Sequence, residues 1–409
     1  MTTSVIRAGG TGVAGVQTTG GDDGALSLKV GPLDTTVEAL SITSAGAATL
    51  ASTLAVTGDL TANNFAGRNK FIGGDFTTNP WQRGTSFAAI ANLAYFADRW
   101  KIGWTSSARM TASKAADAPT AAQAGTFTQH CISLAVTTAD TSIAAADLCV
   151  LTHVIEGLNA ASFGFGQAGS RNVTLSFWVK GTKTGIHCVS IWNSAGSRSY
   201  VAEYTIDSTN TWEYKTITIP VETTGTWLYT NGIGLRLDFS LMTGTNWHTS
   251  ADTWAAGAYF STSNQVNAVD STSNTFKIAL VQLEAGSVAT TFDARSVGTE
   301  LALCQRYYYQ TVYGGSDTTI AHGTAASATV AAQCGSTHPV TMRAIPTLAE
   351  AGTLTAYDGT ANGDIGISVN SCSITNLSFN CTASSLTEGR AVQILANAAA
   401  DYLTLTAEL

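Results

Sequence analysis

The sequence predicts an all-β protein with a fibrous N-terminal shaft segment, a jelly-roll-type β-sandwich, one short helix and a smaller C-terminal β-domain. Large apolar side chains alternate with small or polar ones along many short stretches, and turns rich in Gly, Ser, Thr and Asn separate these stretches. No region alternates strand and helix patterns as a parallel α/β sheet requires. At 409 residues the chain is long enough for two or three folded units.

Residues 1–64 are predicted to form an N-terminal arm and a shaft-like segment, and they contain no aromatic residue. Their large apolar side chains from residue 40 onward are all an even number of residues apart, which predicts short strands: Leu40, Ile42, Leu50, Leu54, Val56 and Leu60. One copy has too few large side chains for a core, so we expect three copies to share one apolar axis. A flexible linker is the alternative.

The glycine pattern of residues 10–15 matches a dinucleotide fingerprint, but turn residues follow it instead of a helix, which indicates a flexible arm.

Residues 65–297 are predicted to form the main β-sandwich, because all nine Trp fall between Trp81 and Trp254. The stretch VTLSFWVK alternates clearly: its apolar residues share one strand face, and Trp178 and Lys180 lie on the other. GLRLDFSL and TFKIALVQL repeat the alternation. Several such strands separated by turns favour an antiparallel sandwich.

Residues 298–310 are predicted to form a connecting helix, and residues 311–409 a second β-domain without Trp. The helix is expected from Thr299 to about Tyr309, with Glu300 in its first turn and Arg306 near its end, as the helix dipole favours. The C-terminal region is expected to be either a separate domain or an extension of the sandwich.

The composition and the motifs limit the classes of function. Charged residues make up 12% of the chain, against roughly 25% in typical globular proteins, and the net charge is −8. We therefore expect no nucleic-acid partner and no attachment to an anionic membrane, since both need Lys and Arg. No run approaches the ~20 apolar residues that span a bilayer, and no secretory signal is recognisable, so we expect assembly in the cytoplasm of the producing cell.

No metal, cofactor or catalytic constellation is expected. The seven cysteines are scattered, and the two that directly follow a His do not have zinc-ligand spacing, so we expect reduced, buried thiols, with Cys372 and Cys381 as candidate cross-strand neighbours. His153 and Glu156 should lie on opposite faces of a strand. With no H-E-x-x-H or G-x-S-x-G motif, we predict that the protein is not an enzyme.

Two segments carry a resemblance to a known family. RNKFIGGDFTTNPWQRGTSF and YFADRW within residues 68–100, with VQLEAGSVATTFDARSVGTELALCQRYYY at residues 281–309, resemble a carbohydrate-binding-module-like β-sandwich of phage and prophage tail-fibre proteins. The stretch LSITSAG to LAVTGDLTAN resembles the shaft segments of such fibres. The resemblance implies a homotrimeric virion fibre that binds other virion proteins through its N-terminal region and a polysaccharide of the host surface through its sandwich.

The residues that carry this resemblance are expected to be mainly structural. Pro80 and Gly84 bracket a turn, and we expect Arg83 or Arg99 to pair with Asp98 and to lie on a Trp ring. A sugar site is the alternative reading of these residues: Trp81, Arg83, Asp98, Arg99 and Trp100.

The loop of residues 242–267 is the predicted glycan-binding surface, because it places aromatic rings among small polar residues. Its candidate contacts, with one exposed arginine from the turn of residues 192–200, are Trp247, His248, Asp252, Trp254, Tyr259 and Arg198. A structural flap that covers the sandwich edge or a neighbouring subunit is the equal alternative. Three other functions stay open: a head fibre or capsid decoration protein, a polysaccharide depolymerase, and a bacterial adhesin, which the missing export signal disfavours.

Overall fold

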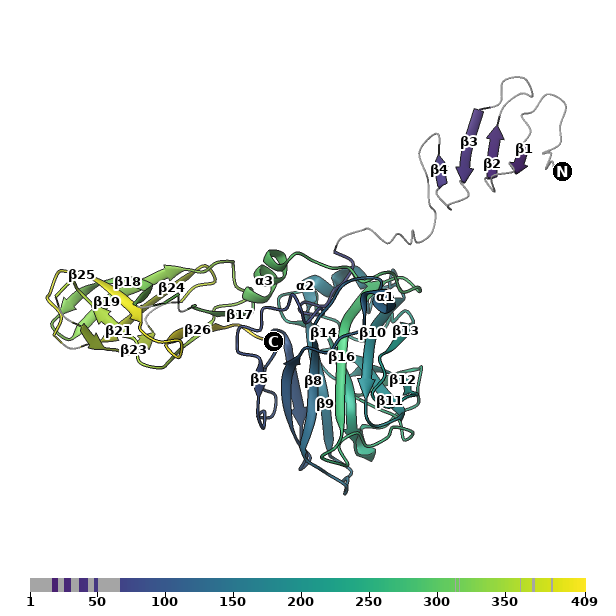
Figure 1. The fold of residues 1–409 in the computed structure, drawn as a ribbon, viewed down its shortest axis with the longest axis horizontal. Helices are drawn as coiled ribbons and strands as arrows, with labels where there is room; N and C mark the ends of the chain where they lie inside the picture. The colour runs from purple at the N-terminus through teal and green to yellow at the C-terminus, as the bar shows by residue number, and fades with distance from the viewer. Residues whose placement is uncertain are drawn as a thin grey trace. The chain divides into compact units, whose positions relative to one another are not determined.

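The structure is a computed structural model that describes residues 17–20, 26–30, 37–42, 48–50 and 67–409, apart from residues 313, 316, 361, 370, 371 and 384. The chain divides into two compact units, Met1–Leu60 and Thr61–Leu409. Almost all regular structure in both units is antiparallel β-sheet, so the predicted all-β fold is confirmed (Figure 1). Among the described residues, no helix is long and apolar enough to cross a membrane.

The first unit holds one four-stranded sheet in the order β1-β2-β3-β4. Its strands are β1 (Gln17–Gly20), β2 (Leu26–Val30), β3 (Val37–Ile42) and β4 (Ala48–Leu50). Leu40 and Leu50, which the alternating pattern assigned to strands, pair directly across β3 and β4. Leu54, Val56, Leu60 and the glycine pattern of residues 10–15 lie outside the described residues.

The sandwich consists of two six-stranded antiparallel sheets, which are drawn in blue to green in Figure 1. Sheet one has the order β13-β10-β16-β8-β7-β5, and sheet two has the order β15-β12-β11-β14-β9-β6. The strands are β5 (Ser86–Phe87), β6 (Trp100–Trp104), β7 (Arg109–Ala115), β8 (Cys131–Thr138), β9 (Leu148–Glu156), β10 (Val173–Gly181), β11 (Gly185–Trp192), β12 (Arg198–Ile206), β13 (Glu213–Ile219), β14 (Ile233–Thr243), β15 (Trp254–Ala256) and β16 (Thr275–Ala285).

The inner faces of the two sheets form one hydrophobic core, as the alternation predicts. On β10, Val173, Leu175, Phe177 and Val179 are all fully buried. Phe177 meets Phe239 of β14 edge to face, with ring centroids 4.9 Å apart. Because neighbouring side chains of a strand point to opposite faces, Trp178 and Lys180 are left on the outer face of sheet one.

The helical segments differ from the prediction in their ends and their number. Helix α3 (Val297–Gln305) begins earlier than expected because the Ser296 hydroxyl accepts a hydrogen bond from the Thr299 amide (3.4 Å) and caps it. It ends before Tyr308 because that residue enters strand β17 (Tyr308–Gln310), which pairs with the C-terminal strand. Short helical turns were not predicted: α1 (Ala121–Ala124), α2 (Gly157–Ala160), η1 (Ala161–Phe163) and η2 (Thr245–Trp247).

The C-terminal region has a hydrophobic cluster of its own, which includes Phe379 and Ile394, although it belongs to the same compact unit as the sandwich. It contains a three-stranded sheet, β17-β26-β20, and a seven-stranded sheet, β22-β21-β25-β18-β19-β24-β23. The further strands are β18 (Thr318–Ser327), β19 (Val330–Thr337), β20 (Thr347–Ala351), β21 (Thr355–Tyr357), β22 (Asn362–Asp364), β23 (Gly366–Val369), β24 (Asn376–Thr382), β25 (Ala391–Ala396) and β26 (Tyr402–Thr406).

The cross-strand cysteine neighbours differ from the candidate pair that the sequence suggested. The sulfur atoms of Cys381 in β24 and Cys334 in β19 lie 3.9 Å apart, whereas Cys372 lies outside the strands, between β23 and β24. All seven thiols are free, and Cys372 is only half-buried.

Candidate functional site

The residues that carry the sequence resemblance form a buried framework. The Trp100 indole is fully buried and donates to Gly73 O (2.9 Å), and the Trp81 indole donates to Phe76 O (3.0 Å). Arg83 pairs with Asp98 at 3.4 Å, as expected. The aromatic partners differ from the prediction, because the guanidinium groups of Arg83 and Arg99 lie over tyrosine rings, at 3.5 Å from Tyr308 and 3.6 Å from Tyr307. These contacts join the sandwich to the segment that leaves α3.

His153 and Glu156 are separated, as their spacing predicted. The His153 ring is buried between Phe71 and Trp100 and its Nε2 lies 2.9 Å from Ile72 O. The Glu156 carboxylate instead accepts hydrogen bonds from Arg306 Nε (2.9 Å) and the Tyr307 hydroxyl (2.6 Å). Neither residue is available to the other for acid–base chemistry.

The predicted aromatic loop is divided between two places. Trp254 belongs to β15, where its ring meets those of Phe165, Tyr200 and Trp227 at centroid distances of 5.7, 5.3 and 5.8 Å. Its indole donates to Pro220 O (3.1 Å), and Asp252 accepts from the Tyr200 hydroxyl (3.3 Å). These contacts cover one edge of the sandwich, as the flap alternative describes.

The remaining loop residues lie elsewhere. Trp247 in η2 rests edge to face on Phe260 (5.3 Å) and donates to Ala146 O (3.0 Å). His248 Nε2 lies 3.2 Å from Thr243 O, and the amide of Tyr259 donates to Ser199 Oγ (3.2 Å). Glycan binding by these residues stays a prediction.

The expected exposure of Arg198 is wrong. Only 22% of its side chain is exposed, and its Nε donates to Glu222 Oε2 (2.9 Å), because β12 holds it beside the loop that carries this carboxylate.

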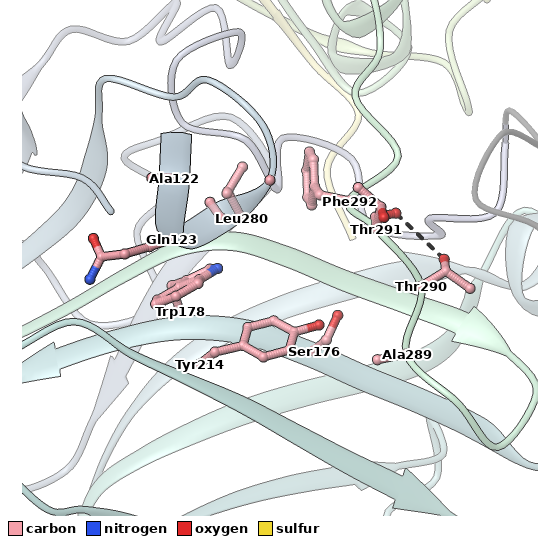
Figure 2. Close-up of a pocket in the computed structure, with 12 residues that line it drawn as sticks. Ala122, Gln123, Ser176, Trp178, Tyr214, Leu280, Ala289, Thr290, Thr291 and Phe292 are labelled. Carbon is pink, nitrogen blue, oxygen red and sulfur yellow. Dashed lines mark hydrogen bonds between the residues drawn. The ribbon is translucent and has the colours of Figure 1, made fainter. Parts of the chain in front are cut away.

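A different aromatic surface lies on the outer face of sheet one. Trp178 of β10 and Tyr214 of β13 are paired directly across the strands, and their ring centroids are 5.3 Å apart. They line a pocket of about 340 Å³ together with Ser176, Leu280 and the loop segment Ala289–Phe292 (Figure 2). Tyr214 is 45% exposed, so a ligand can reach the aromatic pair.

A bulge in β16 shapes the floor of this pocket. The register of β10 with β16 shifts between Ser176 and Trp178, so that Leu280 and Val281 together stand opposite one residue of β10. Leu280 has a φ of 49°, the left-handed conformation that such an extra residue can require. Figure 2 shows Leu280 beside Trp178 and the loop residues Thr290 and Phe292 on the far side of the pocket.

Charged side chains continue the same face beyond Trp178. Lys180 of β10 and Lys277 of β16 are direct cross-strand partners, and both bind Asp117, at 3.0 Å and 2.6 Å from Oδ2. The Trp212 indole donates to Asp117 Oδ1 (3.1 Å). Burial raises the pKa of Asp117, but the hydrogen bonds from Lys277, Lys180 and Trp212 outweigh it and lower that pKa to about 2.

Only part of this outer-face surface could be predicted from the sequence. The alternation along β10 places Trp178 and Lys180 outward, but Tyr214, Trp212 and Asp117 come from β13 and from the two loops before β13 and α1. Only the strand register brings them beside β10. Among the described residues, no group of three or more His, Cys, Asp or Glu side chains is placed to hold a metal ion.

Comparisons with known proteins find distant likenesses only. No family model and no curated protein matches the sequence. One similar solved structure is the enzymatically active domain of tailspike protein 4 of bacteriophage CBA120 (13% identity, TM-score 0.29), of which the chain covers 22% while 54% of the chain is matched. TmCBM61 in complex with β-1,4-galactotriose has 11% identity and a TM-score of 0.26, with 54% of this chain and 99% of that chain covered.

A family 11 carbohydrate-binding module from Clostridium thermocellum, in complex with a β-1,3-1,4-mixed-linked tetrasaccharide, has 10% identity and a TM-score of 0.25. The match covers 51% of this chain and 99% of the module. At identities and TM-scores this low, the likenesses assign no ligand or activity to the chain. The β-sandwich itself rests on its two antiparallel sheets and their shared core.

Proposed function

We propose that the chain is a structural fibre subunit of a phage virion and that its sandwich binds a polysaccharide of the host surface. The observation that carries the binding proposal is the accessible Trp178–Tyr214 pair beside a pocket of about 340 Å³. Aromatic faces stack on sugar rings, and the hydroxyl groups of Ser176, Thr290 and Thr291 in the lining can hydrogen-bond to sugar hydroxyls.

The virion setting is supported by the two sequence segments that resemble tail-fibre proteins, and by the short strands of the first unit. In this proposal the N-terminal region attaches to other virion proteins, the chain forms a homotrimer, and the sandwich binds its polysaccharide without cleaving it. Immunogold imaging of intact particles against residues 311–409 tests the setting, since label at the tail fibres supports it and label at the head favours a head fibre.

The binding proposal is tested by adsorption of the labelled protein to host cells. The double variant W178A/Y214A should lose adsorption by about tenfold or more, because it removes both rings that would contact the sugar. These side chains are partly exposed on an outer face, so thermal melting should change little.

The loop of residues 242–267 is the alternative binding site, and its variant is compared with W178A/Y214A in the same adsorption experiment. If W247A/W254A abolishes adsorption while it still melts cooperatively, and W178A/Y214A adsorbs normally, the polysaccharide binds at the loop of residues 242–267 instead. Release of reducing ends from host polysaccharide by the wild-type protein would show a depolymerase and contradict the non-catalytic role.

A further inference from the structure

We propose that the ligand of this surface is an acidic polysaccharide, and that one of its carboxylate groups binds at the Lys180–Lys277 pair. This inference rests on the proposed function and adds the chemical class of the ligand. The sugar ring next to that carboxylate would lie on Trp178 and Tyr214.

The two lysines are an unusual pair for a β-sheet. They stand directly opposite each other on neighbouring strands, where like charges repel and destabilise the sheet. Among the described residues, Asp117 is the only acidic side chain within 4.0 Å of either ammonium group. One carboxylate for two ammonium groups leaves a local charge of about +1, in a chain whose net charge is −8.

Both ammonium groups have N–H donors left to bind a second anionic partner. Each carries three N–H donors, and each forms one hydrogen bond to Asp117, at 3.1 Å for Lys180 and 2.6 Å for Lys277. Their side chains are 19% and 20% exposed, so they are reachable and yet shielded enough for a charge-assisted hydrogen bond to contribute. The pair already holds one carboxylate, which is the group that a uronic acid would add.

The position of the pair fits a ligand that continues from the aromatic surface. Lys180 follows Trp178 by two residues on the same face of β10, so their Cα atoms are roughly 7 Å apart. Trp212 extends the surface on the far side, since the Lys180 ammonium lies 5.8 Å from its ring centroid and both side chains bind Asp117. Aromatic and cationic groups therefore form one continuous strip.

The test is binding of the full chain to a printed panel of bacterial surface polysaccharides. Each polysaccharide is presented untreated and after carbodiimide–borohydride reduction, which converts its carboxylates to neutral hydroxymethyl groups. We expect binding to acidic members and a loss of about tenfold or more on reduction. Affinity should also fall as the salt concentration is raised from about 50 to about 500 mM, because the shorter Debye length screens the attraction between the lysines and the carboxylate.

Lysine variants test whether Lys180 and Lys277 bind the carboxylate of the polysaccharide. K277Q and K180Q should each weaken binding to the acidic polysaccharide by about tenfold and leave weak binding to the reduced form unchanged. K277R keeps the charge and should retain most of the affinity, which separates lost charge from misfolding. K215Q is the matched control, because Lys215 is also a partly buried, ion-paired lysine of sheet one, but it pairs with Asp207 and Glu213.

The outcomes separate the two proposals. Binding that is unaffected by reduction, or by both K277Q and K180Q, overturns the acidic-ligand inference and leaves the sugar-binding function standing if W178A/Y214A still abolishes it. Binding to no polysaccharide at all, or binding insensitive to W178A/Y214A, overturns the proposed function itself.

Discussion

The ammonium group of Lys101 lies in a place that disfavours its charge. It donates to Leu409 O (2.8 Å), while burial, and then the nearby Arg236 and Arg99, lower its pKa to about 8. In the unfolded chain the same group has a pKa near 10.5. Between these two values the unfolded state binds more protons than the folded state, so the contribution of Lys101 to the free energy of unfolding rises with pH.

We therefore predict a pH-dependent difference between the wild type and K101M. From pH 8 to pH 9.5 the wild type should gain stability relative to K101M, by up to about 1.4 kcal/mol per pH unit. Urea unfolding of both proteins at several pH values measures this. A difference that is flat across the range would contradict the lowered pKa, and K215M should show no such trend.

Cys334 and Cys381 form the second residue-scale prediction, because their sulfur atoms are 3.9 Å apart in the C-terminal core. Oxidised glutathione should take up the two hydrogens of these thiols, leaving a disulfide and two molecules of reduced glutathione. A bridge between residues 47 apart is expected to stabilise the region by about 4 kcal/mol in the chain-entropy view. Peptide mapping without reductant and thermal melting measure both effects.

C381S should abolish the cross-link, while C372S is the matched control and should leave it intact, because Cys372 has no sulfur neighbour of this kind among the described residues. A cross-link that joins Cys372 to Cys381 would instead show that these two residues are the neighbours that the sequence offered as candidates.

At the scale of elements, the residues after β26 fasten the C-terminal region to the sandwich. The Glu408 carboxylate pairs with Arg83 (2.9 Å) and with Arg99, whose side chain is only 1% exposed. Removing one partner of a buried pair leaves an uncompensated charge, which typically costs 3–5 kcal/mol. E408Q should therefore lower the free energy of unfolding by roughly that amount, as chemical denaturation can measure.

Glu388 supplies the control for this prediction, because it is an exposed acidic residue in a turn of the same region. E388Q should change stability by less than about 0.5 kcal/mol. Equal effects of E408Q and E388Q would mean that the pairs with Arg83 and Arg99 do not hold the two parts together.

The strands were predictable, and the surfaces between them were not. Alternation along β10 assigns Val173 and Phe177 inward and Trp178 outward without knowledge of any other strand, because the side-chain period of a strand is local. The pairing of Trp178 with Tyr214 depends on a register that no local pattern encodes. The loop of residues 242–267 looked like a binding surface because its aromatic residues are visible in sequence, whereas the ring neighbours of Trp254 come from three distant segments.

At the scale of the whole molecule, we expect the first unit to depend on partner copies for its stability. Its sheet has four strands of three to six residues, and residues 1–64 contain no aromatic side chain, so a single copy can bury little apolar surface. We therefore predict a homotrimer with a mass by light scattering of about three times the 42.3 kDa of the chain.

Deleting residues 1–60, the first compact unit, should lower the mass toward one chain while circular dichroism still reports a folded β-protein. A monomeric full chain at micromolar concentration would contradict the trimer, and a trimer that survives the deletion would move the contact between copies to the second unit.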